Sequence, residues 1–196
     1  MSKTKSIIRN IIYFILFALM IFAFVYLSEK YKDNSVEKIP TIKDYYSNID
    51  ESSFTIKRGV EVIQVIKNGK QLLLIGNSAN ENSQKYIEEI EVILKELSIE
   101  KANYYDLRFD KEQKNSNYYE IRSLLEGYLS TSDTSTRNLL SPSFYIINNG
   151  KVEYYNTDTA IMKNTDKLAN YWTEEKELEF RVEITNAINK YYLNKQ

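Results

Sequence analysis

The sequence predicts an α/β protein, and three observations lead to this class. Segments with strand-like and helix-like periodicity alternate along the chain, in the order β-α-β-α-β-α-β-β-α. The segment Gln71–Gly76 is a continuous apolar run, as in a strand that is covered on both faces. Asn149 and Gly150 join two strand-like segments near the end of the chain, which indicates a hairpin. From 196 residues we expect one ordinary domain and an appendage.

The appendage is an apolar stretch at the N-terminus, Ile11–Leu27, which has no charged or amide side chain. At ~1.5 Å per residue it reaches about 26 Å, so flanking residues must complete a membrane span. Lys3, Lys5 and Arg9 precede the stretch, and such positive charge indicates a cytoplasmic N-terminus. A cleaved signal peptide shares this pattern, but no small-x-small cleavage site follows, which favours an uncleaved anchor.

The organisation of the whole chain follows from this anchor. Everything beyond it is expected to lie outside the cytoplasmic membrane, so that the lipid bilayer is one expected partner. We predict a cytoplasmic N-terminus at 1–10, a transmembrane signal-anchor helix at 11–28, a polar spacer at 29–52 around Pro40, and a globular domain at 53–193.

The strands of the domain are predicted from alternation and from apolar runs. The candidates are Phe54–Lys57, Gln71–Gly76, Asn103–Asp110, Ser143–Ile147 and Lys151–Asn156. The segment Gly59–Gly69 fits either a helix or a strand. The four Tyr-Tyr pairs of the sequence, at 104, 118, 154 and 191, are expected to mix core packing with exposed rings.

The helices are predicted from 3.6-residue spacing and from capping residues. One begins at Glu81, with Glu88, Glu89 and Glu91 on a solvated face, and a second covers Asn115–Leu129. The last helix spans about 173–193 and begins after Thr173 as N-cap, with acidic residues in its first turn.

Charge and missing residue types exclude several functions. The 26 basic and 27 acidic side chains nearly cancel, so nucleic acid is not an expected partner. The chain has no cysteine and no histidine, which excludes disulfides, thiolate nucleophiles, Ser-His pairs and imidazole ligation of metals. We expect no cofactor, no metal and no catalytic residue.

The elbow between the central strand and the next helix reads "LLLIGNSANENSQKY", Leu72 to Tyr86. This elbow and the order of the elements resemble the thioredoxin fold, which implies a central mixed sheet flanked by helices. The resemblance places the family's Cys-x-x-Cys at Asn80, Glu81, Asn82 and Ser83, so both cysteine positions, Asn80 and Ser83, are substituted. The simplest role for Asn80 and Ser83 is to cap the helix. The family's buried mid-strand acid is also missing, because Leu74 stands there.

A second stretch, "LLSPSFYIINNGKVEYY", is similar to the segment that holds the family's cis-proline. Pro142 is then that proline and Ser141 the residue before it; otherwise Pro142 is a loop proline that starts a strand. The resemblance implies a peptide-binding cleft formed by Ser141, Pro142, Asn80, Glu81 and Asn82, in which an extended peptide pairs with exposed backbone.

The pattern is most similar to membrane-anchored thioredoxins of the bacteriocin-accessory type in Gram-positive bacteria. The resemblance implies a redox-inactive binding or accessory protein with a protein or peptide partner, which assists peptide (bacteriocin) export or a membrane complex. Two alternatives stay open at this point. One is a non-thiol enzyme that uses hydroxyl or carboxylate groups in the same cleft, and the other is a purely structural membrane tether.

Overall fold

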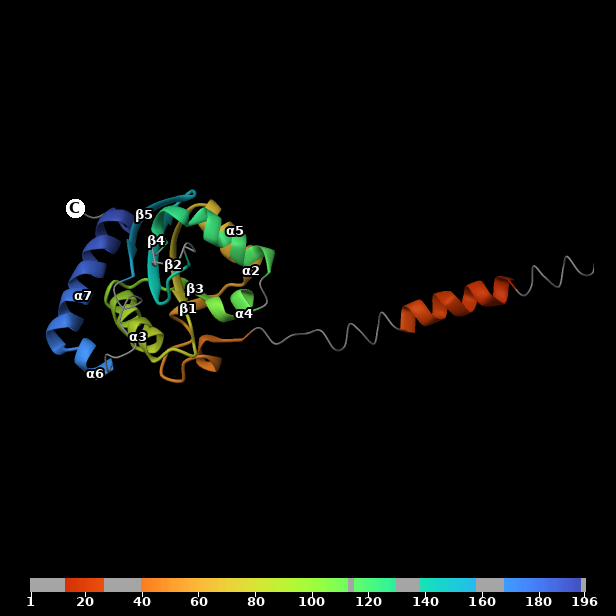
Figure 1. Cartoon of the computed structure of the whole chain (residues 1–196), viewed down its shortest axis with the longest axis horizontal. Helices are drawn as coiled ribbons and strands as arrows, with labels where there is room; N and C mark the ends of the chain where they lie inside the picture. Colours follow the sequence, from red (N-terminus) through yellow and green to blue (C-terminus); the bar gives the residue numbers. More distant parts are fainter. Residues whose placement is uncertain (1–12, 27–39, 113–114, 130–137, 158–167, 195–196) are drawn as a thin grey trace, which may run out of the picture. The chain divides into compact units, whose positions relative to one another are not determined.

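The computed structural model describes residues 13–26, 40–112, 115–129, 138–157 and 168–194 (Figure 1). The chain divides into two compact units, Met1–Ile39 and Pro40–Gln196. Residues 13–26 of the first unit are helical. No helix within the described ranges combines the length and the apolar character that a bilayer crossing requires. The predicted span at 11–28 extends beyond these ranges on both sides.

A five-stranded mixed sheet forms the centre of the second unit. Its strands are β1 (Phe54–Ile56), β2 (Lys70–Gly76), β3 (Ala102–Asp106), β4 (Ser143–Asn148) and β5 (Lys151–Asn156), in the spatial order β1-β3-β2-β4-β5. The first three strands are parallel, whereas β4 and β5 run antiparallel to their neighbours. The predicted α/β class is therefore confirmed, with a mixed sheet flanked by helices.

Helices cover both faces of this sheet. They are α2 (Gly59–Lys67), α3 (Glu81–Glu96), α4 (Leu107–Glu112), α5 (Ser116–Leu124), α6 (Leu168–Tyr171) and α7 (Glu174–Ala187), with 3-10 turns at Ile42–Asp44 and Glu126–Tyr128 and a π-helical turn at Ile188–Tyr192. Figure 1 shows α2 and α5 over one face and α3 and α7 over the other. The ambiguous segment Gly59–Gly69 is thus mainly helical.

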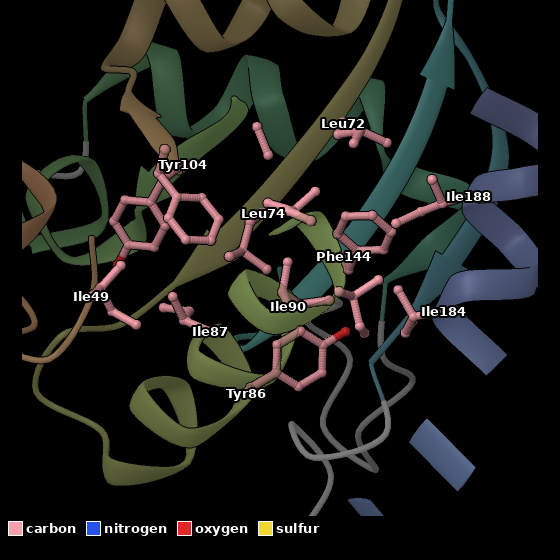
Figure 2. Packing of buried hydrophobic residues seen from close by; sticks show 14 of the residues in the cluster. Ile49, Leu72, Leu74, Tyr86, Ile87, Ile90, Tyr104, Phe144, Ile184 and Ile188 are labelled. Carbon is pink, nitrogen blue, oxygen red and sulfur yellow. The ribbon is translucent and has the colours of Figure 1, made fainter. Parts of the chain in front are cut away.

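The hydrophobic core lies in two layers because side chains alternate along each strand. Leu72 and Leu74 of β2 point toward α3 and α7, where they join Tyr86, Ile90 and other buried side chains (Figure 2). Leu73 and Ile75 point to the opposite layer, beneath α2 and α5. The apolar run Gln71–Gly76 is therefore a central strand that is covered on both faces, as predicted.

The boundary between spacer and domain was predicted too late in the sequence. Ile42, Tyr46 and Ile49 are almost completely buried and belong to the same core layer as Leu74. These apolar side chains come from an irregular segment that begins with the 3-10 turn Ile42–Asp44, and they pack into the core while Lys43, Asp44, Ser47 and Asn48 are exposed. The folded unit consequently begins at Pro40 and not at residue 53.

Two other predictions were wrong in detail. The strand predicted at Asn103–Asp110 ends at Asp106, because Leu107 begins α4. Glu89 and Glu91 were expected on a solvated helix face, yet both are buried. Each of them accepts hydrogen bonds from other parts of the chain, which offsets the cost of removing a carboxylate from water.

The predicted hairpin is confirmed, and its turn is attached to the rest of the sheet. Asn149 and Gly150 both have positive φ, 48° and 84°, the conformation of the tight turns that match strand twist. Asn149 Oδ1 accepts a hydrogen bond of 2.8 Å from the Gly69 N–H, and the Asn149 N–H donates to the Gly69 carbonyl at 2.8 Å. The turn before β2 and the turn after β4 are thereby joined.

Candidate functional site

The elbow between β2 and α3 has the geometry of a capped helix N-terminus. Strand β2 ends at Gly76, and α3 begins at Glu81. The backbone at Asn80 is extended, and Asn80 Oδ1 accepts a hydrogen bond of 2.8 Å from the Asn82 N–H. This bond satisfies one of the free donors of the first helical turn. The predicted capping role of Asn80 is therefore confirmed.

Ser83 has a different role from the predicted one. Its side chain is completely buried, and Ser83 Oγ accepts a hydrogen bond of 3.0 Å from the N–H of Asn77, which precedes the helix. The hydroxyl thus holds the elbow against the first turn of α3 and does not cap that helix. A buried hydroxyl with a backbone partner is a stable arrangement, because the polar atom is satisfied.

The segment before β4 approaches this first turn. Ser83 Oγ lies 3.4 Å from Ser141 Oγ, which comes from a segment 58 residues further along the chain. The Ser141–Pro142 peptide bond is cis, as one of the two sequence interpretations of Pro142 predicted. Ser143 Oγ donates to the Leu140 carbonyl at 2.9 Å and closes the turn around the proline. We call the region where Asn80–Ser83 meets Ser141–Pro142 the elbow cleft, after the cleft that the resemblance predicts there.

The other predicted cleft residues differ in their exposure. Glu81 is exposed at the start of α3, whereas Asn82 and Ser141 are half-buried and Pro142 is buried. Among the described residues, Asn82 Oδ1 has no hydrogen-bond partner. The contact between Ser83 and Ser141 is the direct link between the two halves of the predicted site.

A further part of the site, at the end of β3, was not predicted from the sequence. Asp106, at the end of β3, is buried, and one of its oxygens accepts a short hydrogen bond from Ser78 Oγ in the elbow. The other oxygen accepts from the Arg108 N–H at 3.0 Å and lies 3.3 Å from Arg108 Nε. Because parallel strands end at the same edge of a sheet, the residue that ends β3 could have been placed beside the elbow.

Two tyrosine hydroxyls meet beneath the elbow. Tyr46 and Tyr104 form a hydrogen bond of 2.9 Å between their hydroxyls, and both side chains are buried. Burial raises the pKa of both phenols well above the ordinary value, so both stay neutral at physiological pH. The ring of Tyr104 crosses Gly76, where an added Cβ would lie only 2.5 Å from the hydroxyl oxygen. A side chain at position 76 is therefore incompatible with this packing.

The chemistry available at the elbow cleft is that of hydrogen bonding. Its side chains offer hydroxyls and amides, with the Glu81 carboxylate at the rim and the Asp106–Arg108 pair nearby. A helix N-terminus lowers the pKa of a thiol in the active members of the resembling family, but an amide at position 80 cannot ionise. Since the chain has no cysteine, thiol-disulfide exchange is chemically impossible.

Two comparisons with known proteins found no relative. No family model matches the sequence, and no curated protein matches it. The function must therefore be argued from the site and from the chemistry of its residues.

Proposed function

We propose that the chain is a membrane-anchored, redox-inactive, thioredoxin-like binding or accessory protein outside the cytoplasmic membrane. The observation that carries the proposal is the contact between Ser83 and Ser141. These residues stand at the second cysteine position and at the position before the cis-proline in the resembling family, and their hydroxyls are 3.4 Å apart. Had the two segments lain on different sides of the domain, the family assignment would have failed.

The architecture of the domain supports the same assignment. The chain closes with an antiparallel hairpin, β4–β5, and a final helix, α7, as the resemblance requires. The helix that follows the elbow begins directly after Asn80, so the first substituted cysteine position coincides with the N-cap. The backbone arrangement of the elbow would thus be that of a redox site, whereas the two thiols of such a site are absent.

The elbow cleft would hold an extended peptide by backbone hydrogen bonds. Main-chain pairing of this kind needs no thiol, and it leaves specificity to the side chains around the pairing edge. Ser141 and the half-buried Asn82 would supply polar contacts at that edge, and Glu81 would favour a cationic residue in the client. The activity is therefore binding, in support of peptide (bacteriocin) export or of a membrane complex.

Site-specific crosslinking in intact cells tests this function. A photo-reactive amino acid replaces Glu81 at the rim of the elbow cleft, and in a matched strain it replaces the exposed Glu100. We expect a discrete crosslinked product from position 81 that Ser141→Arg removes, because the larger side chain would block the pairing edge. Ser123→Arg, on the exposed surface of α5, serves as the control substitution.

Two results would argue against the proposed function. Equal crosslinking from positions 81 and 100 would mean that the elbow cleft has no special affinity for a client. A product that persists with Ser141→Arg would place the contact elsewhere on the domain.

A non-thiol enzyme is the second candidate, and the hydrogen bond between Ser78 and Asp106 is the observation that favours it. A carboxylate beside a hydroxyl is the minimal arrangement for nucleophilic attack by serine. Here Asp106 also contacts Arg108, whose Nε lies 3.3 Å from Asp106 Oδ1, so its carboxylate is shared between two partners. Turnover of ester or peptide substrates by the full chain, lost with Ser78→Ala and kept with Ser83→Ala, would support this candidate.

A further inference from the structure

Helix α7 carries apolar side chains on two opposite faces. Phe180, Ile184 and Ala187 point inward and are buried in the core. Leu178 and Val182 point outward, with 64% and 53% of their surfaces exposed. These two residues are four positions apart and therefore lie side by side on consecutive turns. A helix that is apolar on both faces normally has a partner on each.

Carboxylates line one side of this outward pair. At 100° per residue, Glu175 and Glu179 lie along one side of Leu178 and Val182, and both are exposed. Arg181 of the same helix is engaged by the buried Glu89 and does not neutralise them. We call Glu175, Leu178, Glu179 and Val182 the α7 outer face.

Lys176, the other basic residue of α7, also points away from Glu175 and Glu179. Lys176 Nζ lies over the ring of Tyr171, 5.9 Å from its centre, on the side of the helix that approaches α6. Within the described ranges, no ion pair involves Glu174, Glu175 or Glu179. The α7 outer face therefore combines an exposed apolar centre with uncompensated negative charge.

We propose that the α7 outer face is a docking site for a cationic amphipathic helix of a partner polypeptide. The apolar stripe of the partner would cover Leu178 and Val182, and its Lys or Arg side chains would meet Glu175 and Glu179. This site lies on the surface of α7 and does not involve the residues of the elbow cleft. It therefore does not depend on the function proposed for that cleft.

Charge decides between the possible occupants of this face. A second copy of the chain would bring the same carboxylates together across a two-fold contact, which is repulsive. The anionic surface of a membrane would also repel them. A cationic helix satisfies both the apolar centre and the acidic rim, so it is the occupant to which the proposal commits.

Fluorescence anisotropy tests the proposal with a defined probe. The full chain in a non-ionic detergent is titrated into a labelled synthetic helix of Leu and Lys with helical spacing, and binding to protein-free micelles is subtracted. A scrambled peptide of the same composition serves as the probe control. We expect the amphipathic peptide to bind at least about tenfold more tightly than the scrambled one, because only the former presents a continuous apolar stripe.

Protein variants assign the binding to the proposed face. Leu178→Ser with Val182→Ser is expected to weaken binding by about tenfold or more, and the exposed positions of both residues should leave folding unchanged. Glu175→Lys with Glu179→Lys should weaken binding to a similar degree and reduce its dependence on salt.

The matched charge control reverses two exposed carboxylates elsewhere, with Glu100→Lys and Glu126→Lys. It changes the net charge by the same amount and should weaken binding by less than about twofold. Equal weakening by both charge-reversed proteins would overturn the proposal, as would equal binding of the two peptides. Sedimentation that shows self-association of the unmodified chain, abolished by the Leu178 and Val182 substitutions, would also overturn it in favour of a second copy.

Discussion

Replacing Glu89 by glutamine tests how α3 is held against α7. The Glu89 side chain is 2% exposed and receives hydrogen bonds from Lys85 on its own helix, at 2.6 Å, and from Arg181 on α7. Lys85 also pairs with Glu177 of α7 at 2.9 Å. Glutamine keeps the size of the side chain and removes its charge, so the change isolates the electrostatic part of the helix contact.

The expected loss can be worked from this geometry. A hydrogen bond to a charged group contributes about 1.5–3 kcal/mol, and removal of one member of a fully buried ion pair costs about 3–5 kcal/mol. Lys85 and Arg181 are 26% and 37% exposed, so both can turn toward water in the variant, which reduces the cost. We expect a loss of about 2 kcal/mol in the free energy of unfolding, or a decrease of about 4–8 °C in Tm.

The loss should depend on pH with a definite sign. Burial alone would raise the pKa of the Glu89 carboxyl, but the hydrogen bonds from Arg181 and Lys85 outweigh burial and hold this pKa below its ordinary value. A group with a lowered pKa in the folded state stabilises the protein fully above its unfolded value, about 4.3, and loses this contribution as the pH falls through the folded value. The difference between Glu89→Gln and the unmodified protein should therefore be constant near pH 7 and shrink below about pH 4.

Urea unfolding followed by circular dichroism at several pH values measures this difference. The control is Glu88→Gln. Glu88 is a half-buried neighbour on the same helix, and within the described residues its carboxylate accepts a hydrogen bond from Gln84 alone. It should cost less than about 0.5 kcal/mol. If the two variants are equally stable, or if the effect of Glu89→Gln is the same at pH 7 and pH 3, the reasoning about this ion pair is refuted.

Three further variants address the elbow and the residues beneath it. Gly76→Ala should lower the free energy of unfolding by about 1–3 kcal/mol, because the new Cβ meets the buried Tyr104 ring. Thermal or urea unfolding measures this loss, and an unchanged Tm would show that the ring can move. Tyr46→Phe should cost about 1 kcal/mol by removing the partner of the Tyr104 hydroxyl, and a neutral effect would mean that this hydrogen bond contributes nothing. Asn80→Cys with Ser83→Cys should form a reducible intramolecular disulfide and catalyse dithiothreitol-dependent reduction of a disulfide substrate; two thiols that stay reduced would contradict the thioredoxin-like assignment.

Local patterns in the sequence were sufficient for most of the elements. The apolar run at Gln71–Gly76, the pair Asn149–Gly150 and the capping residues Asn80 and Thr173 act through their own neighbours, and each forms the predicted structure. The boundary error at Ile42 is of another kind, because Ile42, Tyr46 and Ile49 lie in an irregular segment that is ordered by packing into the core.

The features that escaped prediction depend on partners far along the chain. Glu89 looks like a surface residue until Arg181, 92 positions later, is placed beside it. The sequence around Asp106 predicts only a strand, and its hydrogen bond with Ser78 of the elbow becomes visible in the structure. No local pattern encodes the contact of Glu89, whereas the place of Asp106 beside the elbow follows from the parallel pairing of β2 and β3 and can be inferred only once that pairing is known.

The paired turns at Gly69 and Asn149 help to fix the register between β2 and β4. Neighbouring side chains of a strand face opposite layers, so sliding β4 by one residue along β2 would exchange Phe144 with Tyr145 and spoil both layers of packing. Hydrogen bonds between the two turns prevent that slip at one end. Six strand pairs separate these turns from Ser143, so the register that they hold also fixes where the Ser141–Pro142 segment enters β4 beside the end of β2.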